Sequence, residues 1–337
     1  MGPRAEQARK GPSRFVIGLT VFTALAFGLY TALWMMGART VKNAVLTFVD
    51  EQRAAGVSLT HGAIKSEGFP FLLRTRIIGI DWQAPQMGHW RADGLYIDAL
   101  PYAFDRVIFS PQGKQVLRVA ALPPPYRDWT GSGETIRASI GRDRQKGWAF
   151  ILDVKTLLLA ADAGPARLSL GDLIVNIHPD DLDGEDLLVS ALAGSAQWAD
   201  GEARAGLTAL ELVAVVSDYI TLNPEAPQGW AGTGGTVRIE RLLVADNPAQ
   251  LTATGDLSLD PSGQPTGRIE TLLQKPGNFI VSLGALGALD ADARAAAMGG
   301  LAVASLAGGG NIKNIFTLEN GEILVDGVPL TPQAPSR

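Results

Sequence analysis

The first hydrophobic pattern in the chain is an uncharged run of 22 residues, from Phe15 to Met36. As a helix with a rise of about 1.5 Å per residue it would span roughly 33 Å, enough for a hydrocarbon core of about 30 Å. A buried core helix of this length would carry a polar stripe, whereas only scattered threonines and Tyr30 interrupt this run. The pattern predicts a transmembrane helix over residues 15–36, with Tyr30 and Trp34 in the interfacial belt.

The residues before this run are basic and set its direction. Residues 1–14 carry a net charge of +3, from four basic residues and Glu6. Because basic flanks stay on the cytoplasmic side, we expect a cytoplasmic tail over 1–14 and export of the rest of the chain. The alternative is a cleaved signal peptide, but its apolar region is only about 7–15 residues long and is followed by small residues. Here the run is longer and ends in the bulky Trp34-Met35-Met36, so we expect an uncleaved anchor.

A helical pattern continues after the anchor. Val41, Val45, Phe48 and Val49 fall on one helical face, and Gly56 is a stop signal. We expect an amphipathic helix over 37–56 that continues the anchor outward and packs its apolar stripe on the domain after it.

From Val57 onward the period changes from helix to strand. Apolar and polar residues alternate over 95–99 and 135–140, and over 166–177 with a shift at Asp172. Such alternation is typical of a sheet with one apolar and one wetted face.

Short turns connect these runs. Residues 260–264 separate two alternating segments, and Asn320-Gly321 separates two more and favours a type I′ turn. Strands joined by short turns predict an antiparallel meander rather than βαβ units. The fold class that we expect is mainly β: a long curved antiparallel sheet of roughly twelve or more strands, shaped like a gutter, in an extracytoplasmic domain over 57–330.

Three further expectations concern the organisation of that domain. An alanine-rich helical insertion is expected over 278–307, either packed on the sheet or acting as a lid. If the sheet is divided into two domains, Gly229–Gly235 is the expected boundary. Residues 331–337 form a tail.

Charge and composition narrow the classes of partner. The whole chain carries −5 and residues 1–14 carry +3, so the remainder carries −8. Nucleic acid is therefore not an expected partner, because phosphate binding needs a basic face. The chain has no cysteine, which excludes disulfides, thiol catalysis and cysteine-ligated zinc.

The sequence carries no arrangement typical of an active site. His61, His89 and His178 are far apart, and neither a nucleophile elbow nor a phosphate-binding loop occurs. The acidic stretch 180–186 mimics part of a calcium loop, but Pro179 and Ser190 occupy ligand positions, so an acidic solvated loop is expected there. We therefore expect no enzyme, no cofactor and no catalytic or metal-ligating residue.

A resemblance to a known family enters at Gly68-Phe69-Pro70-Phe71, followed by an alternating basic and apolar strand. Together with the closing segment around Asn320-Gly321, this resembles the uncharacterised bacterial family called domain of unknown function 2125. We single out Gly68, Phe69, Pro70, Phe71, Asn320 and Gly321 as a structural motif. Pro70 cannot donate to a sheet ladder and predicts a strand entry or edge, with Phe69 and Phe71 as core anchors.

A shorter segment, Gly255–Asp260 with Gly267-Arg268-Ile269, is similar to hairpins of the AsmA-like envelope proteins. That similarity implies a membrane-anchored, curved antiparallel sheet associated with moving or organising lipids between bacterial membranes.

Two functional hypotheses arise from these patterns. In the first, a protein anchored in the bacterial inner membrane holds lipid or another hydrophobic molecule on the apolar face of a periplasmic sheet. The runs 156–161 and 187–192 favour it, because they are apolar on both sides of a strand and need cover. In the second, the protein is a non-enzymatic scaffold of the envelope, and another protein covers those surfaces.

Overall fold

The computed structural model describes residues 14–329, except for 85–87, 101–102, 121, 123–125, 144–146, 181–184, 202, 223–227, 261, 276–310 and 320–321. The expected helical insertion over 278–307 and the residues Asn320 and Gly321 thus lie outside the described residues. So do the tails 1–13 and 330–337 and most of the acidic stretch 180–186.

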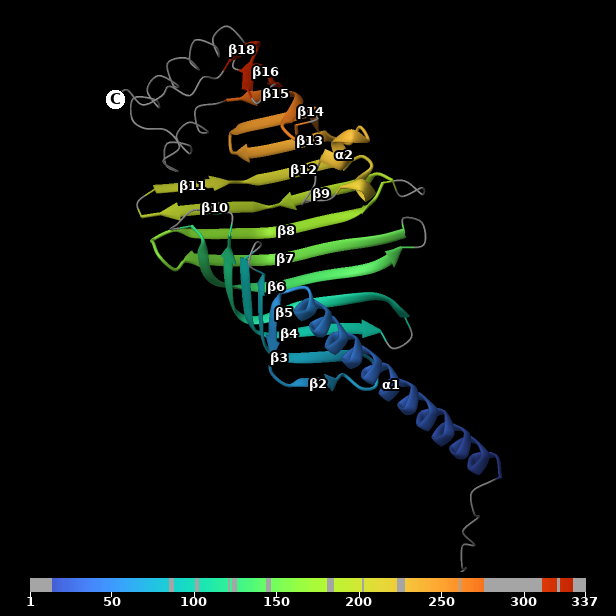
Figure 1. Cartoon of the computed structure of the whole chain (residues 1–337). Helices are drawn as coiled ribbons and strands as arrows, with labels where there is room; N and C mark the ends of the chain where they lie inside the picture. Colours follow the sequence, from blue (N-terminus) through green and yellow to red (C-terminus); the bar gives the residue numbers. More distant parts are fainter. Residues whose placement is uncertain are drawn as a thin grey trace, which may run out of the picture.

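One continuous helix, α1 (Arg14–Ala54), contains both expected N-terminal helices. It is long and apolar enough to cross a membrane: its most apolar stretch has a mean hydropathy of 1.6, and none of that stretch is buried in the protein. The N-terminal half extends away from the sheet, whereas the C-terminal half lies against it (Figure 1). One N-terminal helix of this kind fits a single-pass membrane anchor.

The remainder of the described chain is dominated by one open sheet of 18 strands in which every pair is antiparallel. This confirms the expected mainly-β antiparallel fold. The strands are β1 (Ser58–His61), β2 (Ile64–Glu67), β3 (Leu73–Ala84), β4 (Gly88–Leu100), β5 (Ala103–Val119), β6 (Asp128–Asp143), β7 (Gly147–Ala161), β8 (Arg167–Pro179), β9 (Leu187–Ala193), β10 (Ser195–Asp200), β11 (Ala203–Leu207), β12 (Ala209–Val216), β13 (Thr236–Asp246), β14 (Ala249–Leu259), β15 (Pro265–Gln274), β16 (Asn311–Glu319), β17 (Glu322–Val325) and β18 (Val328–Pro329).

The strands follow one another across the sheet in nearly sequential order. β1 and β2 both pair with β3 at one edge, and β18 forms the other edge. β9 and β10 both pair with β8. A 3₁₀ turn (η1, Tyr219–Thr221) and a short helix, α2 (Gln228–Gly232), separate β12 from β13, yet these two strands pair directly. The sheet therefore continues from β12 to β13 on both sides of Gly229–Gly235, the boundary expected if the sheet is divided into two domains.

Irregular residues align across neighbouring strands and form a crease in the sheet. The ladder between β3 and β4 skips Gly79 and Asp93, the ladder between β6 and β7 skips Thr135 and Lys155, and the ladder between β7 and β8 skips Lys155 and Asp172. Gly79, Thr135 and Asp172 have positive φ, which interrupts the extended backbone, and the pairing register is the same on both sides of each of them. Accordingly, β3 to β6 turn sharply part-way along their length (Figure 1).

The largest buried cluster lies between α1 and the first strands. Val49 of α1 packs with Leu59, Ile77, Leu95 and Ile97. Closer to the N-terminal end of α1, Ala38 packs with Leu73 and Ala99, and Trp34 lies against them. Of the amphipathic stripe predicted for the second part of the helix, Val45 and Val49 pack on the sheet, whereas Phe48 is 54% exposed.

Candidate functional site: the apolar face of the sheet

The face of the sheet on which α1 packs carries apolar residues in unbroken cross-strand rows. Directly paired residues of neighbouring strands point to the same face, so the strand register identifies each row. We call this surface the apolar face. One row consists of Ile97, Phe109, Ala138, Leu152, Val175, Ala191, Leu212, Leu242 and Ala253. The neighbouring row consists of Ala99, Val107, Ile140, Phe150, Ile177, Val189, Ala214, Ile239, Gly255, Ile269 and Phe316.

Helix α1 covers only the beginning of these rows. Ile97 and Ala99 are buried beneath it. Further along, Leu152, Val175 and Leu212 are half-buried, and Ile140 is 50% exposed. The side chains beyond β5 therefore cover one another's flanks and leave part of their apolar surface accessible in the described structure.

Aromatic residues lie at both ends of the strands on this face. At one end Trp198 contacts Tyr126 and Trp129, with ring centroids 5.4 and 5.6 Å apart. The hydroxyl of Tyr126 donates to Asp200 at 2.7 Å, and this hydrogen bond raises the pKa of Tyr126. Leu117 joins this cluster and pairs with Trp90, which packs on the core under α1. The cluster thus lies on the apolar face.

At the other end, Trp148 precedes Phe150 by two residues and shares its face. Its Nε1 donates to the hydroxyl of Tyr219 at 3.3 Å, and the two rings are 6.4 Å apart. Trp230 of α2 is buried and donates from Nε1 to the carbonyl oxygen of Ser217 at 2.7 Å. The segment with η1 and α2 is thereby fixed at this end of the sheet.

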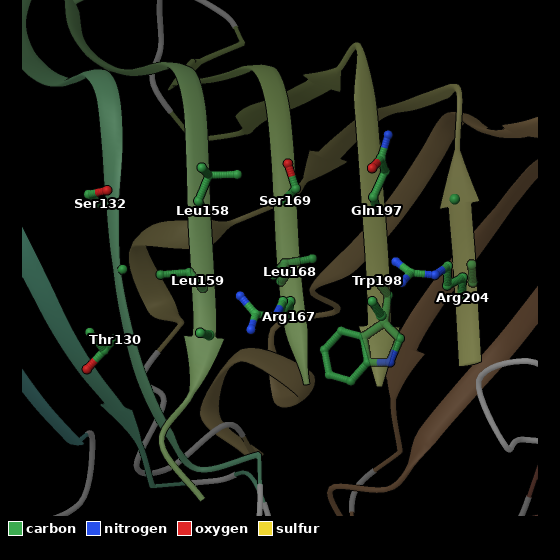
Figure 2. A pocket seen from close by; sticks show the side chains of 15 residues that line it. Thr130, Ser132, Leu158, Leu159, Arg167, Leu168, Ser169, Gln197, Trp198 and Arg204 are labelled. Atoms are coloured by element: carbon green, nitrogen blue, oxygen red, sulfur yellow. The ribbon is translucent and has the colours of Figure 1, made fainter. Parts of the chain in front are cut away.

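A pocket of about 670 Å³ lies over β6, β7, β8, β10 and β11 (Figure 2). The cross-strand row that lines it is Ser132, Leu158, Ser169 and Gln197. This row is offset by one residue from Leu159, Leu168 and Trp198 of the aromatic cluster, so it belongs to the opposite face. Its lining is polar and apolar in about equal parts and includes Arg167 and Arg204, both exposed. The pocket is therefore separate from the apolar face.

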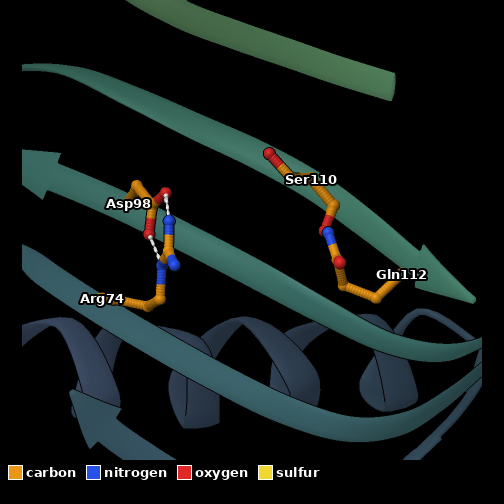
Figure 3. Close-up of polar contacts among 4 residues, drawn as sticks. All are labelled: Arg74, Asp98, Ser110 and Gln112. Atoms are coloured by element: carbon orange, nitrogen blue, oxygen red, sulfur yellow. Dashed lines mark hydrogen bonds and ion pairs between the residues drawn. The ribbon is translucent and has the colours of Figure 1, made fainter. Parts of the chain in front are cut away.

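The opposite face is also polar where α1 covers β3 and β4. Arg74 donates from Nε and a terminal nitrogen to both carboxylate oxygens of Asp98, each at 2.7 Å, while α1 lies on the other side of the strands (Figure 3). The guanidinium carbon of Arg74 lies 4.6 Å from the centre of the Tyr96 ring. The hydrogen bond to Asp98 raises the pKa of Arg74. Nearby, Gln112 donates to the carbonyl oxygen of Ser110 at 3.1 Å.

The titratable residues singled out in the sequence stay apart in the structure. His89 lies 2.8 Å from Asp81, which also accepts from Arg91 at 2.7 Å. His61 and His178 each lie within hydrogen-bond distance of a neighbouring backbone carbonyl. Among the described residues no three histidine, aspartate or glutamate side chains form a group that could hold a metal.

The motif residues 68–71 form the turn between β2 and β3. Gly68 has φ of 92°, and a Cβ there would lie 2.5 Å from the carbonyl oxygen of Leu72, so the turn needs glycine. Phe69 packs against aromatic side chains of α1 rather than in the core of the sheet. The expectation that Phe71 is a core anchor is wrong, because its side chain is 82% exposed.

The sequence predicts only that Tyr30 and Trp34 lie in the interfacial belt. Their contacts with this turn were not predicted. Asn320 and Gly321 lie outside the described residues, but the flanking pair Glu319 and Glu322 closes the ladder of the expected hairpin.

Comparison with known proteins gives one match. No curated protein and no solved structure matches the chain, and the similarity to AsmA-like proteins stays a prediction. Residues 34–334 match a family described as "Uncharacterized protein conserved in bacteria (DUF2125)". This match covers α1 from Trp34 and every strand of the sheet. The chain therefore belongs to the DUF2125 family of bacterial proteins.

Proposed function

We propose that this protein is a non-enzymatic lipid-binding protein of the bacterial envelope. In this proposal α1 anchors it in the inner membrane with residues 1–14 in the cytoplasm, and the periplasmic sheet holds acyl chains on its apolar face. The observation that carries the proposal is the pair of unbroken apolar rows that continue far beyond the cover of α1.

The size of this surface argues for a ligand. Beyond the cover of α1, the row from Ala138 to Ala253 crosses seven strands, or roughly 29 Å at about 4.8 Å per step. One acyl chain fills half of a hydrocarbon core, about 15 Å, so the row is long enough for at least one chain. Contiguous accessible apolar surfaces above a few hundred Å² are rare on soluble domains unless a partner or ligand covers them.

A photo-reactive amino acid placed at Leu152 or at Ile151 of the full-length protein in bacterial membranes tests the proposal. These neighbours on β7 are both half-buried but point to opposite faces. We expect ultraviolet light to give lipid adducts at position 152 and not at 151, read by mass spectrometry of the purified protein. Absence of lipid adducts at 152, or equal lipid adducts at both positions, would refute lipid binding by this face.

A scaffolding role is the second candidate, and one observation on the opposite face favours it. Ile174 and Leu192 are directly paired there and both are exposed, and Leu158 is 52% exposed. A protein partner that packs on this face would bury them. In the same experiment scaffolding predicts a protein adduct at position 151.

A further inference from the structure

The turn Gly68–Leu72 is attached to the part of α1 that is expected to lie in the membrane. The ring of Phe69 lies 5.9 Å from that of Phe27 and 5.4 Å from that of Trp34. The hydroxyl of Tyr30 donates to the carbonyl oxygen of Pro70, and Nε1 of Trp34 donates to that of Leu72 at 3.2 Å. The turn is thus held along about two turns of helix.

The position of these contacts along α1 sets the depth of the turn. The uncharged span ends at Met36. Phe27 precedes Met36 by nine residues, or about 14 Å along a helix axis. The order of contacts agrees, because Leu73, just after the turn, packs on Ala38, whereas Ile77 and Ile80 pack with Val49 further from the membrane. The turn therefore lies deeper along the expected span than the contacts that Leu73, Ile77 and Ile80 make with α1.

Three carbonyl oxygens of the turn are hydrogen-bonded, which lowers the cost of placing the turn in an apolar medium, where an unpaired polar group is costly. The carbonyl oxygen of Gly68 accepts from the backbone nitrogen of Leu72 at 2.9 Å. The carbonyl oxygens of Pro70 and Leu72 accept hydrogen bonds from the side chains of Tyr30 and Trp34, respectively. Pro70 has no N–H to satisfy.

The side chains of the turn complete this picture. Phe71 is 82% exposed next to a helix whose residues Leu25, Leu29 and Leu33 are also exposed. The turn itself carries no charged residue. The nearest charged residues lie on β2 and β3, where Glu67 is opposite Arg74 and Lys65 is opposite Arg76 in the strand register.

We propose that the turn Gly68–Leu72 is a second membrane contact, which inserts Phe71 among the acyl chains of the leaflet on the side of the sheet. Phe69 fills the gap between turn and helix. The inserted turn fixes the first strands against the bilayer surface. The inference rests on the membrane anchoring of α1 and is independent of lipid binding by the apolar face.

Because the chain has no cysteine, a single introduced cysteine can be labelled specifically, and the label reports how deeply that position lies in the bilayer. Phe71→Cys and the control Ile220→Cys, at a 68% exposed apolar residue on η1, are labelled with the fluorophore NBD in the full-length protein. The labelled proteins are reconstituted in phosphatidylcholine vesicles. We expect blue-shifted emission at position 71 that nitroxide-bearing acyl chains quench at least two-fold more than at position 220, and that aqueous iodide quenches less.

Equal spectra and equal quenching at the two positions would overturn the proposal. A benzoyl-phenylalanine at position 71 keeps the aromatic ring and gives a second measurement should the cysteine variant fail to fold. We expect its adducts to be lipid, and adducts only to protein would contradict insertion. Lipid adducts at Leu152 without adducts at position 71 would remove this inference alone, and the reverse result would remove the proposed function alone.

Discussion

Asp81 shows how single residues stabilise the polar face of the sheet. Burial raises the pKa of this carboxyl, but hydrogen bonds from Arg91 and His89 lower it by more, so its pKa falls below the ordinary 3.8. A carboxyl with a depressed pKa contributes stability above its unfolded-state pKa, and this stability is lost as the pH falls through the folded-state pKa. The residue therefore links β3 and β4 at neutral pH but not in strong acid.

We expect Asp81→Asn to lower the free energy of unfolding by about 1 kcal/mol at pH 7, because the charge-assisted hydrogen bonds are lost. The difference from the unmodified protein should shrink and disappear as the pH falls through the lowered pKa of Asp81, where Asp81 itself becomes protonated. Thermal unfolding between pH 2.5 and 7 measures this, with the exposed Asp162→Asn as the control. A constant difference at every pH would show that the carboxylate charge is not the cause.

Single residues also show where sequence reasoning reached its limit. Gly68 and Pro70 stand out in the sequence alone, because glycine permits a left-handed backbone that other residues avoid and proline fixes φ. The side of the turn to which Phe71 points depends on a helix about 40 residues earlier in the chain, as the pairing of Tyr30 with Pro70 shows. Hydrophobicity alone could not separate burial in a core from exposure beside a membrane helix.

At the scale of elements, the crease determines how the strands bend. Gly79 and Gly113 both have positive φ, of 59° and 71°. A Cβ at Gly79 would meet nothing within 4 Å, whereas a Cβ at Gly113 would lie 2.3 Å from Oδ2 of Asp93. The same oxygen accepts from the backbone nitrogen of Lys114 at 2.7 Å. Substitutions at these two glycines thus distinguish the cost of backbone strain from the cost of steric crowding.

We expect Gly79→Ala to destabilise the protein by about 1–2 kcal/mol, the cost of a left-handed conformation for a residue with a Cβ. Gly113→Ala should cost at least about 1 kcal/mol more, because it also displaces Asp93 from its hydrogen bond. Denaturant unfolding of the full chain in detergent measures both. Equal losses would mean that the contact of Asp93 with Gly113 does not stabilise the crease.

The irregular positions of the strands differ in how well the sequence predicts them. The irregularity at Asp172 was predictable, because the apolar positions change from even to odd numbers there. The irregularity at Gly79 was hidden, because Ile77, Ile78 and Ile80 are apolar on both sides of it. Such an irregularity keeps the pairing register but changes which alternate residues of a strand share a face, so the rows of the apolar face could not be assembled from periodicity alone.

At the scale of the whole molecule, the N-terminal tail and the sheet are expected on opposite sides of the bilayer core. In a chain without cysteine, Ala5→Cys and Ser66→Cys report this topology directly. We expect a membrane-impermeant maleimide to label position 66 and not position 5 in spheroplasts, because basic flanks stay in the cytoplasm. After lysis both positions should react, and the opposite pattern would reverse the orientation.

The unbroken course of α1 has a mechanical consequence. No break separates its exposed apolar part from Val49, which the sheet buries. A spanning helix adjusts its tilt to the thickness of the surrounding lipid. Without a hinge, that tilt rotates the strands as one body, so the local thickness of the membrane sets the angle at which the sheet stands above it.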